Sequence, residues 1–203
     1  MNALRIIIAE DHYRVRRGMR QIVADEFPDA FIAEAENVAS LKSQVFEKDW
    51  DLVISDFSMP GGNGLKALHQ IRVQRPFLPV LMVSIYPEEQ YAIPVLSAGA
   101  SGYLNKDSIS DKLTVAIKTI LNGERYLIPG MEFPPHLSLS LKESFVFNCM
   151  MNGNGVDAAL LHLTRDEIES IKVSVFQKLQ LGTPAQLEAY VREHKLSKMN
   201  SYS

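Results

Sequence analysis

Cysteine is almost missing from this 203-residue sequence, which contains a single one, Cys149. One cysteine excludes an internal disulfide and fits a reducing compartment, so we interpret Cys149 as a buried helix residue rather than a reactive thiol. No apolar run approaches transmembrane length, and the first residues lead into Ile6-Ile7-Ile8 without the layout of a signal peptide. We therefore expect a cytoplasmic protein with no membrane partner.

The sequence also lacks an excess of either charge. It has 21 Lys and Arg against 24 Asp and Glu, a formal net charge of -3. This balance excludes a global electrostatic attraction to nucleic acid or to an anionic membrane. With 46% hydrophobic and 22% charged residues, the composition is that of an ordinary globular protein. Its length allows one large domain or two small ones.

Apolar, β-branched runs alternate with helical patterns through the first two-thirds of the chain. The predicted strands are Arg5–Ala9, Phe31–Glu34, Leu52–Ser55, Val80–Ser84 and Gly102–Leu104. The predicted helices lie near Val15–Glu26, Val38–Lys48, Leu65–Arg75, Glu88–Ala98 and Asp111–Asn122. Such alternation predicts an α/β fold with a five-stranded, doubly wound parallel sheet.

A change of pattern follows the last of these helices. Gly123 closes it, and Pro129-Gly130 and Pro134-Pro135 follow within a dozen residues, which indicates a linker. From Leu139 to Leu196 the pattern is helical throughout. We therefore predict a first domain at 1–126, a linker at 127–138 and a small all-α domain at 139–203.

Polar residues follow four of the five predicted strands. The first strand runs into Glu10-Asp11, the third into Asp56, the fourth ends at Ser84 and the fifth runs into Lys106. In an open parallel sheet, ligands bind beyond the carboxyl ends of the strands. A hard divalent cation such as Mg²⁺ would relieve the repulsion of three carboxylates, and a lysine with a hydroxyl would complement a phosphoryl group.

Each of these residues also has a simpler reading by itself. Asp56 fits a turn, Ser84 fits a helix cap, and Lys106 fits a solvated surface side chain. Their placement at four strand ends of one sheet nevertheless predicts a shared functional site.

At these residues the sequence resembles a known family. Residues 4 to about 126 resemble the receiver domain of bacterial two-component response regulators. The motifs that carry the resemblance are Ile8-Ala9-Glu10-Asp11-His12, Ser55-Asp56-Phe57-Ser58-Met59-Pro60-Gly61-Gly62-Asn63-Gly64, Val83-Ser84 and Ala98-Gly99-Ala100-Ser101-Gly102-Tyr103-Leu104-Asn105-Lys106-Asp107. The stretch from Tyr86 to Ala92 resembles the branch that carries a LuxR-type helix-turn-helix output domain. The resemblance implies a flavodoxin-like receiver.

The resemblance implies a role for each site residue. Asp56 would accept a phosphoryl group from a histidine kinase, and Lys106 would pair with a phosphoryl oxygen. Ser84 would hydrogen-bond another oxygen, and Tyr103 would reorient as the space near Ser84 changes. Mg²⁺ would be held by the carboxylates of Glu10, Asp11 and Asp56 and by the backbone carbonyl of Ser58. Such a protein is not an enzyme on a separate substrate, because it promotes only its own phosphoryl transfer and dephosphorylation.

Two residues depart from the receiver pattern. Ile85 is larger than the alanine found in many receivers and is interpreted as slowing access to Asp56. Pro94 lies inside the fourth predicted helix, where a missing N–H is expected to shorten or kink it.

The second domain resembles the LuxR-type family more weakly. Leu139-Ser140-Leu141-Lys142-Glu143 is similar to its opening helix, Gly153 falls at its glycine turn, and Thr164 is expected to cap the recognition helix. The segment between these helices, Asn154–Leu163, is about two residues shorter than the family pattern. The resemblance implies DNA contacts from Arg165, Lys172 and Lys178.

The charge of the second domain argues against tight DNA binding. Residues 131–203 contain seven basic and eight acidic residues, whereas DNA-binding domains are normally basic. Glu169 and Ile171 stand where the family usually has lysine and often has histidine. Two functions therefore remain open: a phosphorylation-controlled, homodimeric transcription regulator, and a phosphorylation-controlled interaction or dimerisation module that does not bind DNA. A stand-alone metal-dependent phosphatase is disfavoured, because the sequence signals no separate substrate pocket.

Overall fold

The computed structural model describes residues 3–153, 156 and 163–196 of the chain. The chain divides into two compact units, 1–133 and 134–203, and the division falls inside the segment predicted as a linker. Within the described residues, no helix has both the length and the apolar character needed to span a bilayer.

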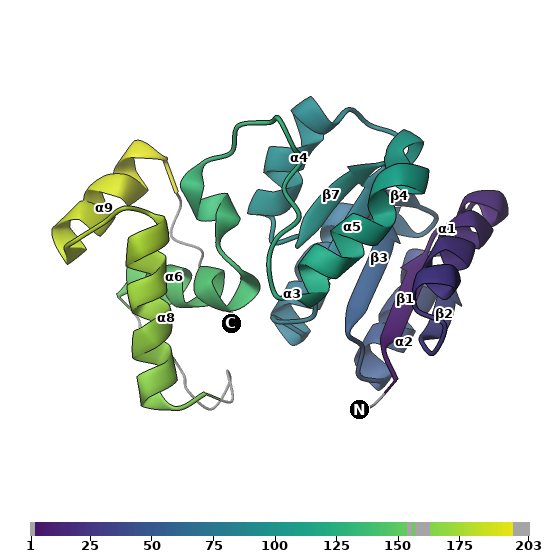
Figure 1. Ribbon diagram of the computed structural model, residues 1–203, viewed down its shortest axis with the longest axis horizontal. Coiled ribbons are helices and arrows are strands. Elements are labelled where there is room, and N and C mark those ends of the chain that lie inside the picture. Colours follow the sequence, from purple (N-terminus) through teal and green to yellow (C-terminus); the bar gives the residue numbers. More distant parts are fainter. Residues whose placement is uncertain (1–2, 154–155, 157–162, 197–203) are drawn as a thin grey trace. The chain divides into compact units, whose positions relative to one another are not determined.

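The first unit is built on a five-stranded parallel sheet (Figure 1). Its strand order is β2-β1-β3-β6-β7, where the strands are β1 (Arg5–Ala9), β2 (Phe31–Ala35), β3 (Leu52–Asp56), β6 (Val80–Ser84) and β7 (Gly102–Asn105). In chain order these are strands 2-1-3-4-5, the arrangement of flavodoxin-like folds. The predicted doubly wound parallel sheet is confirmed.

Helices cover both faces of this sheet (Figure 1). On one face, α1 (Tyr13–Glu26) and α5 (Ile109–Leu121) pack on Ile6 and Ile8. On the other face, α2 (Val38–Glu47), α3 (Gly64–Gln74) and α4 (Glu88–Ser97) pack on Ile7 and Val53. Successive strand residues point to opposite faces, so apolar runs without alternation supply both cores.

The strand register brings the predicted site residues to one edge. Ala9 of β1 lies opposite Ser55 of β3, and Asp56 lies opposite Val83 of β6. Ser84 lies opposite Asn105 of β7. Because all these strands are parallel, the residues that follow them emerge at the same edge.

A small hairpin, absent from the sequence prediction, follows β3. The antiparallel strands β4 (Ser58–Met59) and β5 (Gly62–Asn63) are joined at Gly61, whose φ of 90° favours glycine. A Cβ at Gly64 would lie 2.7 Å from the carbonyl oxygen of Phe57, so this position also requires glycine. Strands of two residues are too short to show the alternation of apolar and polar residues from which strands are predicted.

Pro94 lies inside α4 without ending it. The helix continues to Ser97, and the N–H of Ala98 donates to the carbonyl of Pro94 at 3.0 Å. The helix ends one residue before the predicted boundary.

The second unit is helical over its described residues, as predicted. It contains the 3₁₀ turn η2 (Pro135–Ser138) and the helices α6 (Leu141–Asn152), α8 (Arg165–Lys178) and α9 (Pro184–Glu193). Its core consists of Leu139, Phe147, Val175, Leu179, Leu187 and Tyr190. Gly153 closes α6 with a φ of 67°, and Thr164 caps α8 in a capping box with Glu167, as expected. The segment predicted to be shortened lies outside the described residues, apart from Val156 and Leu163.

Candidate functional site

Asp56 is the last residue of β3 and is buried, with 3% of its surface exposed. The chain is fixed on both sides of it, because Asp56 pairs with Val83 and the N–H of Phe57 donates to the carbonyl of Val83 at 2.9 Å. A buried carboxylate is costly unless a cation or hydrogen-bond donors compensate its charge.

Lys106 supplies that compensation. It begins the 3₁₀ turn η1 (Lys106–Ser108) directly after β7, and only 11% of its side chain is exposed. Its Nζ lies 2.6 Å from Oε2 of Glu10 and 3.2 Å from Oδ2 of Asp56. The structure therefore brings together three residues that the sequence placed at the ends of three strands.

The acidic loop after β1 completes this edge. Glu10 is fully buried, while 27% of the Asp11 side chain is exposed. Nδ1 of His12 lies 3.2 Å from Oε1 of Glu10 and 2.9 Å from Oδ1 of Asp11. Sequence reasoning assigned His12 no role, although its position directly after the acidic pair was a usable signal.

The donor atoms of this loop fit a divalent cation. One ligand atom each from Glu10, Asp11 and His12 lie within 4.8 Å of one another. Lys106 pairs with Glu10 and Asp56, and Asp11 adds a third carboxylate beside them, so a cation would relieve a local excess of negative charge. A cavity of about 500 Å³ adjoins the loop, lined by Asp11, Phe57, Ser58, Met59, Pro60, Gly62 and Asn63. The carboxylate oxygens among these donors suit Mg²⁺.

Ser84 and Tyr103 lie side by side next to the loop that joins β6 to α4. Ser84 is 1% exposed, and its Oγ accepts a hydrogen bond from the N–H of Tyr86 at 3.1 Å. Tyr103 is fully buried, and its hydroxyl donates to the carbonyl of Tyr86 at 2.9 Å. Burial raises the pKa of the Tyr103 hydroxyl, while a hydrogen bond with Ser84 acts in the opposite direction. Ser84 and Tyr103, which the family resemblance makes the switch residues that respond to phosphorylation, therefore hold the same loop segment.

The same loop has further partners that the sequence reasoning did not identify. Nδ2 of Asn105 donates to the carbonyl of Tyr86 at 3.1 Å, and the N–H of Asn105 donates to Oε1 of Glu88 at 3.1 Å. The Tyr86 ring stacks on Tyr91 with centroids 4.9 Å apart and meets Phe57 edge to face. Ile85 is 71% exposed, so its side chain lies on the surface.

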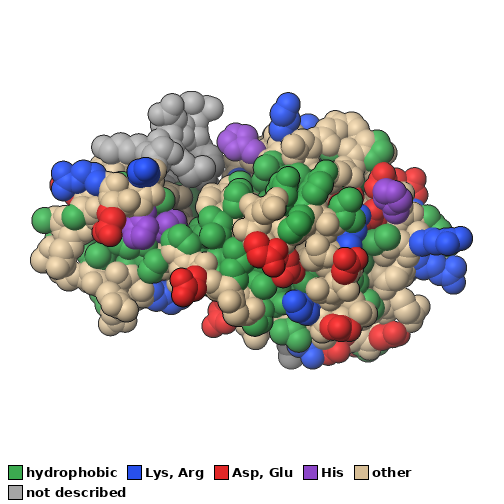
Figure 2. All heavy atoms as spheres, turned by 90° about the horizontal axis from the view of Figure 1, so that it is seen from above, with side chains coloured by type: hydrophobic (Ala, Val, Ile, Leu, Met, Phe, Trp, Pro, Cys, Tyr) green, Lys and Arg blue, Asp and Glu red, His purple; other side chains and the backbone are tan. Residues whose placement is uncertain are grey.

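In the second unit, two of the three residues predicted to contact DNA are engaged in ion pairs. Nζ of Lys172 lies 2.7 Å from Oε1 of Glu169, and Nζ of Lys178 lies 2.8 Å from Oε2 of Glu143. Arg165 is exposed at the first turn of α8. On the face shown in Figure 2, acidic and basic side chains are interspersed with hydrophobic ones.

Glu143 is a structural residue that the sequence reasoning used only as part of a motif. Its side chain is 10% exposed and accepts hydrogen bonds from Lys178, from Ser174 at 2.6 Å and from the N–H of Ser140 at 2.8 Å. Burial alone would raise the pKa of this carboxyl, but the hydrogen bonds outweigh burial and the pKa is lowered from 4.5. Glu143 therefore ties the start of α6 to the end of α8.

Comparison with known proteins agrees with this geometry. The chain is 35% identical over 128 residues to the glycerol metabolism activator of Pseudomonas putida, a match that covers 63% of this chain. The chain spans 58% of the length of that relative. It is 28% identical over 214 residues to the oxygen regulatory protein NreC of Staphylococcus carnosus (strain TM300), covering 95% of this chain and 99% of NreC.

A solved structure gives the same picture of the fold. RcsB from Salmonella enterica serovar Typhimurium, bound to promoter rprA in the presence of the phosphomimetic BeF₃⁻, is 27% identical with a TM-score of 0.55. The match covers 93% of this chain and 98% of the RcsB chain. The family model of the response regulator receiver domain matches residues 6–118, more than half of the sequence and the whole of the edge that carries Glu10, Asp56 and Lys106. The chain belongs to the response regulator receiver domain family.

Proposed function

We propose that the chain is a two-component response regulator that accepts a phosphoryl group on Asp56 from a histidine kinase. The observation that carries this proposal is Lys106, whose Nζ contacts both Glu10 and Asp56 at the carboxyl edge of the sheet. A largely enclosed lysine between carboxylates that follow or end separate strands is suited to meet the oxygens of an incoming phosphoryl group. In this proposal the protein is cytoplasmic and forms a homodimer.

The proposed transfer balances as a displacement at phosphorus. An Oδ atom of Asp56 forms the new O–P bond, and the P–N bond to the kinase histidine breaks. The leaving imidazole nitrogen regains a proton. Lys106, already 3.2 Å from Asp56, then pairs with a phosphoryl oxygen.

Glu10, Asp11, Asp56 and the backbone carbonyl of Ser58 are the proposed Mg²⁺ ligands. When bound, the ion neutralises charge on the phosphoryl oxygens during transfer. Asp11 and Ser58 line the same cavity, which supports their joint assignment.

Ser84→Ala is expected to accept the phosphoryl group but to respond poorly to it. Without Oγ, the loop at Tyr86 loses one of the contacts that hold it, and no hydroxyl can follow a phosphoryl oxygen. Light scattering before and after treatment with acetyl phosphate should show little phosphorylation-dependent dimerisation for this variant. Dimerisation equal to that of the wild type would remove Ser84 from the switch.

In this proposal the second unit binds DNA and thereby regulates transcription. NreC aligns with almost the whole chain, and the RcsB structure contains a promoter, which supports this assignment. Titration of the phosphorylated protein against duplex DNA at two salt concentrations tests it. Salt-dependent binding by the wild type is the expected result, because phosphate contacts release counterions.

A second function, binding to protein rather than DNA, is favoured by one observation. Lys172 and Lys178 are both paired with carboxylates of their own unit, and Asp166, Glu167 and Glu169 place negative charge on the first turns of α8. A helix with this charge pattern is poorly suited to approach a phosphate backbone. In this alternative the unit is a phosphorylation-controlled interaction or dimerisation module.

Glu169→Lys separates the two functions. The change replaces an acid by a base and also frees Lys172 from its 2.7 Å ion pair. In a DNA-binding unit it should strengthen nonspecific binding and steepen the loss of affinity with salt. Glu188→Lys is the matched control, because it makes the same charge change on an exposed position of α9.

The two variants give distinct outcomes when titrated in parallel. Stronger binding by Glu169→Lys than by Glu188→Lys supports a DNA-facing α8. Equal, weak binding by both variants, with none by the phosphorylated wild type, supports the interaction module.

A further inference from the structure

Arg16 is a buried cation that the proposed chemistry does not use. It lies in the first turns of α1, and 5% of its side chain is exposed. The sequence reasoning assigned it no role. A guanidinium in this position is retained at a desolvation cost, so its partners indicate what it does.

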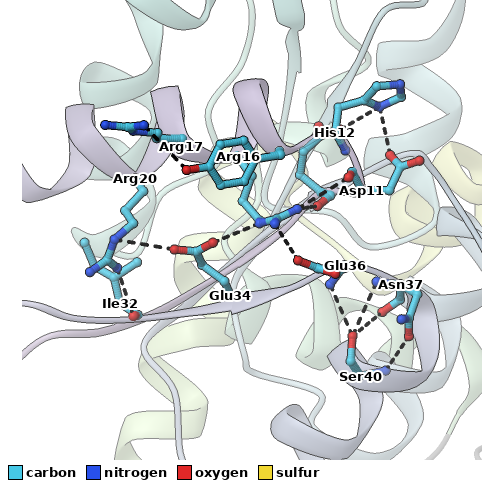
Figure 3. Close-up of polar contacts among 12 residues, drawn as sticks. Asp11, His12, Arg16, Arg17, Arg20, Ile32, Glu34, Glu36, Asn37 and Ser40 are labelled. Atoms are coloured by element: carbon cyan, nitrogen blue, oxygen red, sulfur yellow. Dashed lines mark hydrogen bonds and ion pairs between the residues drawn. The ribbon is translucent and has the colours of Figure 1, made fainter.

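Two of its partners are the backbone of the acidic loop. Nη1 of Arg16 donates to the carbonyl of Glu10 at 2.7 Å and to the carbonyl of Asp11 at 3.4 Å (Figure 3). These are two of the four residues proposed to hold Mg²⁺. Fixing a peptide plane restricts the direction of the attached side chain, so Arg16 restrains where both carboxylates point.

The other partners of the guanidinium are two carboxylates. Nε donates to Oε2 of Glu34 at 2.8 Å, and Nη2 donates to Oε1 of Glu36 at 2.6 Å (Figure 3). Glu36 stands just before the Asn37–Ser40 capping box of α2, and its own N–H lies 3.3 Å from Oγ of Ser40. All three guanidinium nitrogens are therefore engaged, and the planar fork is tied to β2 and to the start of α2.

Arg20 shows which of these contacts are specific to Arg16. It lies one turn further along α1, where its Nε is 3.4 Å from Oε1 of Glu34 and its Nη1 donates to the carbonyl of Ile32. Arg20 thus shares the anchor Glu34, and its contacts are to β2 rather than to the acidic loop. A purely structural role at the α1–β2 junction would be common to both arginines.

We propose that Arg16 is a positioning residue that sets the Mg²⁺ affinity of the acidic loop by holding the carbonyls of Glu10 and Asp11. This inference rests on the proposed function, in which Glu10 and Asp11 are metal ligands. Residues behind a metal site typically change metal affinity by about 10- to 100-fold when they are replaced. We expect a loss of that size for Arg16→Met, which removes the donors and keeps an unbranched apolar stem.

The test measures Mg²⁺ binding by titration calorimetry in the full chain without any phosphoryl donor. Arg16→Met should bind Mg²⁺ about 10- to 100-fold more weakly, whereas Arg20→Met should bind it like the wild type. Thermal unfolding in the absence of Mg²⁺ provides the stability of each variant. Labelling by acetyl phosphate at saturating Mg²⁺ should return Arg16→Met close to the wild-type extent, because Asp56 and Lys106 remain.

The results separate this inference from the function on which it rests. A wild type that binds no Mg²⁺ overturns the proposed metal site itself. Wild-type Mg²⁺ binding in a folded Arg16→Met overturns the positioning role alone, as does an equal loss in Arg20→Met. Arg16→Lys decides the question if the Met variant is unfolded: an ammonium cannot serve both carbonyls and carboxylates, so affinity should fall by roughly 10-fold, and unchanged affinity contradicts the inference.

Discussion

Asp56→Asn is expected to abolish phosphoryl acceptance from acetyl phosphate in the presence of Mg²⁺. The neutral amide is not a nucleophile, and it removes the charge that lies 3.2 Å from Nζ of Lys106. Intact-mass spectrometry should show one added phosphoryl group on the wild type and none on this variant. The amide is close to isosteric, so the buried end of β3 should retain its fold.

Asp107→Asn is the control for this experiment. It removes the same charge one residue beyond Lys106, but Asp107 is exposed. Labelling of this variant should match the wild type. Persistent labelling of Asp56→Asn would show that another residue is the phosphoryl acceptor and would refute the central assignment.

Lys178→Met is expected to destabilise the second unit by about 2 kcal/mol. The substitution leaves Glu143 buried with its serine contacts but without a cation, and Lys178 is itself 43% exposed, so the loss is below that of a fully buried pair. Hydrogen exchange of α6 and α8 in the full chain measures this loss directly. Exchange through opening of the unit should accelerate by roughly 30-fold, since 1.4 kcal/mol corresponds to about a factor of ten.

Lys172→Met is the matched control on the same helix. Its partner Glu169 is 67% exposed, so this surface pair should contribute less than about 1 kcal/mol. Equal exchange rates in the two variants would contradict a special role for the pair between Glu143 and Lys178.

Acidification provides a second test of the ion pair between Glu143 and Lys178. The pKa of Glu143 is lowered in the folded unit, so the stabilisation is complete above the unfolded value near 4.5 and is lost as pH falls through the folded pKa. The difference between wild type and Lys178→Met should therefore be full at neutral pH and should shrink only under strongly acidic conditions.

The sequence by itself determined the sheet of the first unit and the residues at its edge. Apolar β-branched runs such as Ile6-Ile7-Ile8 bury both of their faces, so their alternation with helical segments leaves few other folds. Parallel strands share one carboxyl edge, and for this reason the sequence alone groups Glu10, Asp56, Ser84 and Lys106 in one site. The helix-capping roles of Thr164 and Gly153 could likewise be predicted from the sequence, because capping depends on neighbours within a few residues.

Only the tertiary structure decided which charges meet. Arg16 finds Glu34 and Glu36 across 18 and 20 residues of sequence, and Glu143 finds Lys178 across 35. Such pairs cannot be predicted from hydrophobic periodicity. A polar residue on a helix surface gives the same sequence pattern whether its side chain faces water or a carboxylate on another element. Packing selects the partner and removes the water, and burial then gives each contact its energetic weight.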